Sequence, residues 1–411
     1  MTAFERASGV LLPVASLPSG TLGDDALRFV DWLADAGQRW WQILPFGPPD
    51  QFGSPYASAS AFAGSPTWIS GREAVVGAEE IEAFVASHPF WSGAWAAYRG
   101  PGAIADQVRF DREWHRVRTH AAERGVRILG DMAFAIAPGS ADHVGSPELF
   151  KTGVVGGVPP DDWSADGQRW GTPVYDWATM RAERHRWWIE RFRRAVELVD
   201  AVRIDHFRGF VAAYEIPAGS RTARSGRWVR GPGRAVFDAV KDALGDVAVV
   251  AENLGVITPP VERLRRSLGF PGTVVLQFAF ADGMVNPERG VIAPDDVVYT
   301  GTHDNDTSTG WWIDASDRER ARVEAAVREL GRDDTEPHWM LIRIALDSAA
   351  AVAVIPAQDV LGLDGTARTN VPGRAGGNWR WRLRPGQLDA ALAARLRDAT
   401  DVAGRWSSPG S

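Results

Sequence analysis

The stretch AVRIDHFRGF, residues 201–210, places four ionisable side chains within six positions: Arg203, Asp205, His206 and Arg208. Its first half is apolar and typical of a buried strand. A solvated turn would account for one or two charged residues there. It would not account for an arginine inside the strand followed by a carboxylate and a histidine at its end, because charged groups are rarely buried without a partner. The stretch therefore indicates a functional site at a strand end.

Two further acidic residues end apolar runs, Glu252 after VAVVA and Asp304 after VVYTGTH. Two carboxylates that flank a glycosidic bond can act as nucleophile and as general acid/base, at a separation of about 5 Å in the covalent route. A nucleophile must stay ionised, and Arg203, two residues earlier on the same strand face, can hold Asp205 charged. The acid needs a raised pKa, which suits Glu252 after the more apolar run. Together these acids predict a site that acts on sugars.

Each of these residues also has an ordinary structural explanation. A single acid at a strand end is commonly a loop-start residue or a helix cap. A single histidine, whether His206 or His303, can be a buried core residue, although both are natural hydrogen-bond donors to sugar hydroxyls. The clustering favours the functional interpretation, because carboxylates aimed at one mouth repel each other and cost stability.

Apolar runs that alternate with helical patterns supply the elements that would position these residues. Runs without polar alternation indicate strands covered on both faces, hence a parallel sheet. Eight such units predict an α/β fold of the (β/α)8 barrel type, in which the strand ends converge on one mouth; an open doubly wound sheet is the alternative. The expected strands are SGVLLPV (8–14), RWWQILPF (39–46), VRILGD (126–131), AVRID (201–205), VAVVAE (247–252), TVVLQFAF (273–280), VVYTGTHD (297–304) and VAVIPAQD (352–359).

We expect the whole chain, 1–411, to form a single catalytic barrel. Two connections, about 46–106 and 132–177, are too long for plain loops between a strand and a helix. Both are rich in glycine, proline, serine and tryptophan. They are predicted to be insertions that build the rim of the active-site cleft.

The composition argues against several classes of protein. The formal net charge is −7 and no block of basic residues stands unpaired, so we expect no nucleic-acid partner. The absence of cysteine rules out disulfides and thiolate metal sites. No stretch reaches the ~20 apolar residues of a membrane span, and no signal-peptide pattern is visible, so a cytoplasmic protein without a membrane partner is expected. The 19 tryptophans offer flat faces that can stack on sugar rings.

A series of longer motifs, in order along almost the whole chain, is similar to the motifs of one family. The chain resembles the amylomaltases, which are the 4-α-glucanotransferases or disproportionating enzymes of glycoside hydrolase family 77, within the α-amylase clan. The motifs are QILPFGPPDQFGSPYASASAFAGSP, GVPPDDW, GQRWGTPVYDW, RIDHFRGF, GPG, AENLG, PGTVVLQFAF, YTGTHDNDT and ARTNVPGRAGGNWRWRL.

The resemblance implies an enzyme that transfers α-1,4-glucan segments between maltooligosaccharides by a retaining double displacement, with neither cofactor nor metal. It implies Asp205 as nucleophile, Glu252 as general acid/base and Asp304 as the third carboxylate, which holds the distorted donor sugar. Tyr56, in SPY, is implied to stack on glucose. The other substrate-binding residues that it implies are Asp131, Arg203, His206, His303, Asn305 and Asn370.

The sequence departs from the family pattern at positions expected on the rim, while the three acids are intact. The segment between residues 70 and 106 is much shorter than usual, and GDMAFA (130–135) stands where the family has GDLP followed by an aromatic residue. These departures bear on subsite preference and acceptor range. The single departures are Asn253 for an acid, Ser65 and Thr172 for asparagine, and Thr369 for methionine.

Three other functions are compatible with parts of the sequence. An α-glucan hydrolase on the same scaffold would share the covalent intermediate and give it to water. A metal-dependent transferase of nucleotide sugars is suggested by Asp304-Asn305-Asp306, a D-x-D motif, although no P-loop or G-x-G-x-x-G accompanies it. A non-catalytic glucan-binding relative would be expected to have lost one of the three acids.

Transfer rather than hydrolysis requires a site that orients the acceptor and excludes water. The segment GRWVRGPG (226–233) matches the family's flexible loop over the cleft. We expect it to cover the cleft together with aromatic side chains, and we expect net disproportionation of maltotriose to glucose and longer chains. The aromatic residues are Tyr56, Trp163, Trp170 and Trp177.

Overall fold

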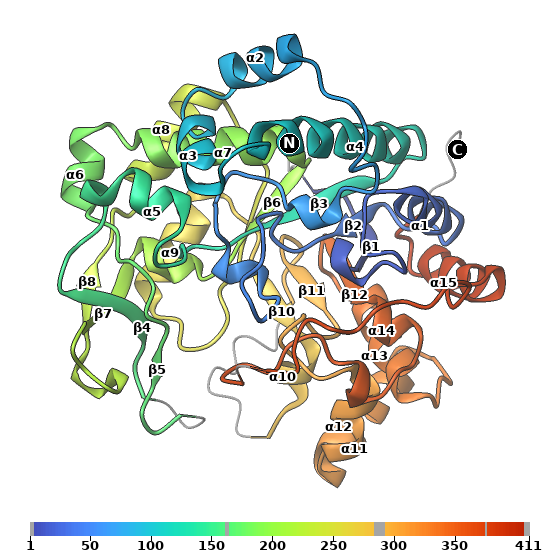
Figure 1. The fold of residues 1–411 in the computed structure, drawn as a ribbon. Helices are drawn as coiled ribbons and strands as arrows, with labels where there is room; N and C mark the ends of the chain where they lie inside the picture. Colours follow the sequence, from blue (N-terminus) through green and yellow to red (C-terminus); the bar gives the residue numbers. More distant parts are fainter. Residues whose placement is uncertain (1–3, 161–163, 283–291, 375, 407–411) are drawn as a thin grey trace. The chain divides into compact units, whose positions relative to one another are not determined.

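The computed structural model describes residues 4–160, 164–282, 292–374 and 376–406. Eight parallel strands form one hydrogen-bonded series in the order β10-β11-β12-β1-β2-β3-β6-β9, with helices between them along the chain (Figure 1). Each strand overlaps one of the eight expected runs, so the (β/α)8 prediction is confirmed. The strands are β1 (Ala7–Leu11), β2 (Trp40–Gln42), β3 (Arg127–Met132), β6 (Ala201–Ile204), β9 (Val249–Ala251), β10 (Thr273–Val275), β11 (Val297–Tyr299) and β12 (Val352–Pro356).

The chain divides into two compact units. Both segments expected as insertions lie within unit 2. That the whole chain works as a single catalytic barrel stays a prediction. Unit 1 comprises Met1–Leu44, Arg116–Leu129 and Pro271–Ser411, and unit 2 comprises Pro45–His115 and Gly130–Phe270.

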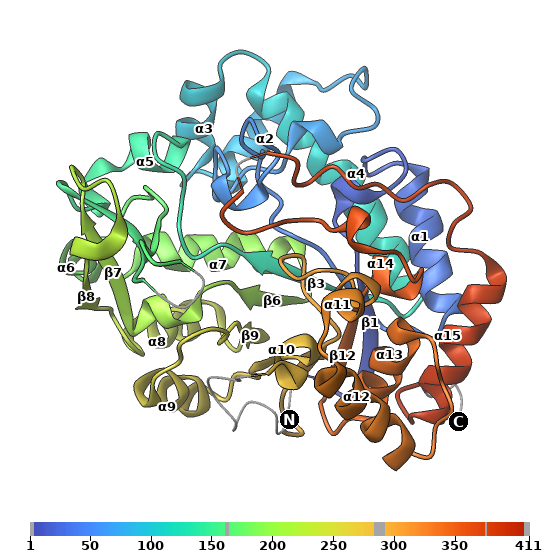
Figure 2. The ribbon, with the colours of Figure 1, turned by 90° about the horizontal axis from the view of Figure 1, so that it is seen from below.

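Unit 1 is built around β1, whose five residues are all buried. Gly9 pairs with Val354 of β12 on one side and with Trp40 of β2 on the other. A Cβ atom at Gly9 would lie 2.4 Å from the Trp40 carbonyl oxygen, so only glycine fits this close approach. Helices α1 and α15, which are far apart in the sequence, lie side by side (Figures 1 and 2). The helices are α1 (Asp24–Asp35), α10 (Leu276–Phe280), α11 (Ser308–Asp314), α12 (Asp317–Glu329), α13 (Pro337–Asp347), α14 (Ala357–Val360) and α15 (Ala390–Val402), and α4 (Ala103–Glu123) begins in unit 2 and ends in unit 1.

The expected strand TVVLQFAF is only partly a strand. β10 ends at Val275, and Leu276 begins α10. Gln277 is buried in this helix and donates a hydrogen bond to the Asp306 carbonyl oxygen at 2.8 Å. A continuous apolar run does not distinguish a buried strand from a buried helix, which is why the sequence overestimates the strand.

Unit 2 packs its helices around β6 and a cluster of aromatic rings. Helices α7 and α8 pack against each other (Figures 1 and 2). The fully buried Trp188 contacts the rings of Phe134, Tyr175 and Phe210. Trp177 belongs to the same cluster and is buried, so it is not available to cover a cleft as predicted. The helices are α2 (Ala78–Ser87), α3 (Ser92–Arg99), α5 (Ala141–Gly145), α6 (Trp177–Ala182), α7 (Arg186–Leu198), α8 (Ala235–Leu244) and α9 (Pro259–Leu268).

A second sheet, antiparallel and four-stranded, was not predicted from the sequence. Its order is β5-β4-β7-β8, and β8 occupies half of the segment GRWVRGPG that was expected to be a flexible loop. Trp228 of β8 pairs with Tyr214 of β7, and their rings are 5.1 Å apart. Trp163, expected beside this segment, lies outside the described residues. The strands are β4 (Val154–Val158), β5 (Gln168–Arg169), β7 (Ala212–Pro217) and β8 (Arg227–Arg230).

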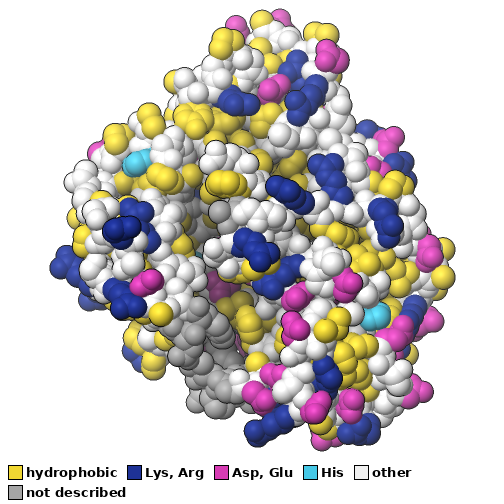
Figure 3. Space-filling view, turned by 60° about the horizontal axis from the view of Figure 1, so that its bottom comes forward, with side chains coloured by type: hydrophobic (Ala, Val, Ile, Leu, Met, Phe, Trp, Pro, Cys, Tyr) yellow, Lys and Arg dark blue, Asp and Glu magenta, His cyan; other side chains and the backbone are white. Residues whose placement is uncertain are grey.

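Two observations concern possible partners. Among the described residues, no helix is long and apolar enough to cross a membrane. On the face shown in Figure 3, basic and acidic side chains are interspersed rather than gathered by sign.

Candidate active site

Asp205 and Glu252 directly follow β6 and β9, whose last residues, Ile204 and Ala251, are partners in the parallel register. Two backbone hydrogen bonds continue the pairing, from Glu252 N to Ile204 O at 3.0 Å and from Phe207 N to Glu252 O at 3.2 Å. Neighbouring strands lie about 4.8 Å apart, so the two carboxylates leave adjacent strand ends on the same edge. Unit 2 thus brings together the predicted nucleophile and the predicted acid/base.

Backbone N–H groups hold both oxygens of the Glu252 carboxylate. His206 N donates to Oε2 at 2.8 Å, and Leu254 N donates to Oε1 at 2.5 Å. Burial raises the pKa of Glu252 above its ordinary value; the positive charge of Arg203 opposes this shift and the negative charge of Asp205 adds to it. A carboxyl group with a raised pKa suits a proton donor near neutral pH.

Arg203 connects the strand-end acid to a buried carboxylate. Its Nη1 donates to Asp131 Oδ2 at 2.7 Å and to Asp205 Oδ1 at 3.1 Å. Tyr56 Oη donates to the same Asp131 oxygen at 3.1 Å. The Asp131 side chain has no exposed surface. It bonds to Tyr56 and Arg203, which, like Asp131, are residues predicted to bind substrate.

The electrostatics of this network follow from its burial. Burial raises the pKa of Asp131 to about 7, although the charge of Arg203 opposes the shift. Its Oδ1 is buried and has no hydrogen-bond partner among the described residues, so the ionised form is poorly compensated. Burial also lowers the pKa of Arg203, but the charges of Asp131 and Asp205 more than offset this and hold it above its ordinary value. Arg203 therefore stays charged beside Asp205.

His206 occupies the turn that follows the nucleophile. Its backbone is left-handed, with φ of 51°, and this sharp turn places its N–H on Glu252. Burial lowers the pKa of His206 to about 4, so its ring is neutral at pH 7. The ring of the partly exposed Trp170 lies nearly perpendicular to the imidazole, with centroids 4.9 Å apart. A neutral imidazole can still donate one hydrogen bond to a hydroxyl.

Unit 1 holds the third acid with an amide, a guanidinium and a histidine. Asn370 Nδ2 donates to Asp304 Oδ1 at 2.6 Å, and Arg368 donates to the Asp304 carbonyl oxygen at 2.5 Å. His303 is buried next to Asp304, with 3.4 Å between its Nε2 and Asp304 Oδ1. Asn305 is buried and its Oδ1 accepts from the backbone and side chain of Thr302, which orders the loop. His303, Asp304 and Asn370 thus form one local group, and Asn305 supports it.

The second aspartate of the D-x-D motif has a structural role. The Asp306 carboxylate accepts from the Thr307 N–H at 2.7 Å, and a Cβ at Gly310 or Gly365 would fall within 3.0 Å of it. The two carboxylates of the motif therefore accept from different groups, Asp304 from the Asn370 amide and Asp306 from the Thr307 N–H. Among the described residues, no group of three or more metal-ligating side chains gathers.

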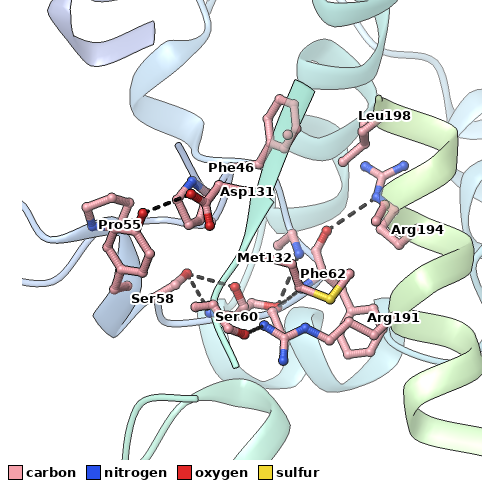
Figure 4. A pocket seen from close by; sticks show the side chains of 18 of the residues that line it. Phe46, Pro55, Ser58, Ser60, Phe62, Asp131, Met132, Arg191, Arg194 and Leu198 are labelled. Carbon is pink, nitrogen blue, oxygen red and sulfur yellow. Dashed lines mark hydrogen bonds between the residues drawn. The ribbon is translucent and has the colours of Figure 1, made fainter. Parts of the chain in front are cut away.

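A cavity of about 70 Å³ in unit 2 borders Asp131 (Figure 4). Its walls come from the segment 45–63, from the end of β3 and from α7. Alanine occupies positions 133 and 135, which follow β3 and line the cavity. Both alanines belong to GDMAFA, the segment that departs from the family motif. Small side chains therefore leave the space behind Asp131 open.

Sequence reasoning assigned no role to two charged residues that the structure places close to the site residues. Arg208 donates to the Val256 carbonyl oxygen at 2.6 Å, in the loop after Glu252. Asp359 is fully buried and accepts from Ser308 N and Oγ and from Thr300 Oγ1, which anchors the segment around Asp304. The signal for Asp359 was present, because it too ends an apolar run, VAVIPAQD.

The fold and these carboxylates define a class of protein, the (β/α)8 enzymes whose strand-end acids suit retaining chemistry on glycosides. The family model described as 4-alpha-glucanotransferase matches residues 12–89 and 103–389. The 4-alpha-glucanotransferases of Thermus thermophilus and a Synechocystis strain are 39% and 38% identical to this chain, over 97% and 98% of it and 99% and 98% of their own lengths. The chain therefore belongs to the 4-α-glucanotransferase family, as its motifs predicted.

Solved structures agree with this assignment. The amylomaltase from Streptococcus agalactiae, in complex with acarbose, matches with a TM-score of 0.85 and 28% identity, over 98% of this chain and 100% of its own. The amylomaltase from Corynebacterium glutamicum, at 17% identity and a TM-score of 0.77 over 97% of this chain and 75% of its own, supports the fold. The alignment with the Thermus enzyme spans 495 positions against 411 residues here, so that relative carries additional residues within it.

Proposed function

We propose that this chain is a 4-α-glucanotransferase that moves α-1,4-glucan segments from one maltooligosaccharide to another. The observation that carries the proposal is the pairing of Asp205 and Glu252 at adjacent strand ends, with Arg203 beside the first and backbone N–H groups on the second. Family membership supports the same activity.

The reaction proposed is a double displacement. Asp205 attacks the anomeric carbon and forms a β-glycosyl ester while Glu252 protonates the leaving oxygen; Glu252 then removes a proton from the 4-hydroxyl of the acceptor, which displaces Asp205. The charged guanidinium of Arg203 hydrogen bonds to the attacking carboxylate. The family motif assigns Asp304 the stabilisation of the oxocarbenium-like sugar, with Asn370 orienting its carboxylate.

Donor-sugar recognition is proposed for Tyr56, His206, His303, Asn305 and Asn370. Tyr56 is anchored by its hydroxyl on Asp131, which leaves the ring face for stacking on glucose. Arg203 and Asp131 would act on the sugar through Asp205 and Tyr56 rather than by direct contact. For Asp131, this follows from its lack of exposed side-chain surface.

The alternative within the same mechanism is hydrolysis. Water at ~55 M competes for the glycosyl ester, and an acceptor held in place gains an effective molarity of ~10⁵ M or more. The half-exposed Trp170 and Trp228 in unit 2 provide apolar surface that can hold an acceptor and exclude water.

The product pattern from pure maltotriose separates the two outcomes. Transfer gives glucose and longer chains with little rise in total reducing ends, because each bond broken is replaced by another. Chromatography and a reducing-end assay on the same samples measure both quantities. A rise in reducing ends in step with the loss of maltotriose would establish a hydrolase.

We propose that the reaction needs no metal and no cofactor, since charged and hydrogen-bonded side chains supply every role assigned above. Activity is expected to be unchanged after dialysis against a chelator. Loss of activity that a divalent ion restores would contradict this and would favour a metal-dependent transferase.

A further inference from the structure

Two separate loops supply the N–H groups that hold Glu252. The turn after β6 contributes His206 N, and the loop after β9 contributes Leu254 N. The carboxylate can keep both hydrogen bonds only if these loops stay at a fixed separation. Charge-assisted hydrogen bonds of this kind are strong and depend on geometry, so small loop movements would change the acidity of Glu252.

Arg208 joins the same two loops. It lies in the short helix Phe207–Phe210, directly after the first loop, and its Nη1 donates to the Val256 carbonyl oxygen of the second at 2.6 Å. The guanidinium carbon also lies 3.6 Å from the centre of the Trp228 ring, on β8. A planar guanidinium can stack and donate at once, which an ammonium group cannot do equally well.

We propose that Arg208 is a positioning residue for the general acid/base: it fixes the 254–256 loop and the β7–β8 hairpin against the turn that carries His206, and thereby sets the geometry and charge around Glu252. This rests on the role proposed for Glu252. No contact of Arg208 with substrate is required, and its effect is transmitted through the Val256 carbonyl and the Trp228 ring.

The charge of Arg208 acts on the pKa of Glu252 in one direction. The positive charge of Arg208 favours the ionised form of Glu252, so its loss raises the pKa of Glu252. Glu252 must be protonated in the first step, and the basic limb of the kcat/KM profile therefore moves to higher pH. The charged or titratable groups around Glu252 are Arg203 with Asp131 behind it, Asp205, His206, Arg208 and, through Asn253, Glu262 of α9.

Three variants of the full chain test the proposal. Arg208→Met removes charge, stacking and hydrogen bond, and Arg208→Lys keeps only the charge. Arg234→Met is the matched control, because Arg234 also links two segments of unit 2 by donating to a carbonyl oxygen, that of Ser267 at 2.7 Å. The measurements are kcat/KM against pH on maltotriose, KM for a glucose acceptor, and the first step with α-maltotriosyl fluoride, whose leaving group needs no proton.

Arg208→Met is expected to shift the basic limb upward by about 0.5 pH unit and to lower kcat about tenfold or more, with the fluoride step nearly unchanged. Arg208→Lys should restore the limb but not all of kcat, and Arg234→Met should alter neither.

A raised acceptor KM with an unshifted limb would show that Arg208 binds the acceptor instead. Equal loss on maltotriose and fluoride would assign it a merely structural role. Full activity of Glu252→Gln would instead overturn the role proposed for Glu252. That result differs from each result that would contradict the role proposed for Arg208.

Discussion

In unit 2 the Asp131 side chain has no exposed surface and shares the buried Arg203 with Asp205, whereas in unit 1 the Asp304 side chain is 46% exposed and bonds to the neutral amide of Asn370. The first arrangement places the Asp131 and Arg203 side chains where water cannot screen them. The second leaves the acid in contact with solvent and uses a hydrogen bond to orient it.

This difference determines what each acid can do. In unit 2, burial raises the pKa of Glu252 beside these charged groups, which suits a proton donor. An exposed acid that is oriented by an amide can stabilise a developing cation in the transition state. Removing a charged side chain in unit 2 should therefore change activity or stability strongly. Removing the Asn370 amide in unit 1 should lower activity only slightly.

The largest effect is expected for Asp205→Asn. An amide cannot form the glycosyl ester, so kcat on maltotriose should fall by about 10⁴-fold or more. Folding should be nearly unchanged, because Arg203 keeps its bond to Asp131. Mass spectrometry of the wild type after reaction with a glycosyl fluoride should find the label on the peptide that contains Asp205; a label on another peptide would sink the assignment.

Glu252→Gln should lower turnover of maltooligosaccharides by about 10²–10⁴-fold, since proton transfer to the leaving oxygen is lost. The first step with α-maltotriosyl fluoride should remain, because fluoride leaves without a proton. Rapid-quench measurement of fluoride release isolates that step. If both substrates lost activity equally, Glu252 would serve binding or structure rather than proton transfer.

Asp131→Asn tests the buried side of the comparison through stability. The raised pKa of about 7, against an ordinary 3.8, means that the folded protein holds this proton more tightly than the unfolded chain does. The free energy of unfolding of the wild type should therefore fall as pH rises from about 4 to about 7, on the order of 3 kcal/mol from this group. The variant should lack this fall, so its stability relative to wild type should improve with pH.

Urea unfolding at pH 4.5 and 7.5 measures the Asp131 effect. The control is Asp35→Asn in α1, an acid with a side chain 68% exposed, which should leave the pH dependence unaltered. Parallel wild-type and Asp131→Asn curves would mean that Asp131 is ionised and compensated in the folded protein.

The sequence predicted the parts of the site that depend on strand ends. Asp205 and Glu252 follow apolar runs, and the register of parallel strands places them together without further information. It did not predict that Asp131 would be enclosed, because burial of a strand residue depends on what Tyr56 and the segment 45–63 place over it.

The remaining errors have the same origin in long-range packing. Trp177 looked like a rim residue because it lies in a glycine-rich connection, yet it packs against Tyr175 and Trp188. The antiparallel sheet was missed because its strands come from two distant connections, and short strands such as β5 carry little periodic signal. Arg208 was noticed only as a charge, since its stacking on Trp228 depends on that sheet.

The smallest effect is expected in unit 1, for Asn370→Ala. The substitution removes the 2.6 Å hydrogen bond that orients the Asp304 carboxylate but leaves its charge in place. An exposed acid loses little by rehydration, so kcat should fall only about tenfold, a change of ~1.4 kcal/mol in activation free energy. KM for maltotriose should rise less, because orientation of Asp304 matters most when charge develops on the sugar. Asn378→Ala is the matched control, since Asn378 Nδ2 bonds to the backbone carbonyl oxygens of Val371 and Arg374 in the same segment. If Asn370→Ala instead lowered activity as strongly as Asp205→Asn, the third acid would depend on its partner as much as the acids of unit 2 do, and the contrast between the two units would not hold.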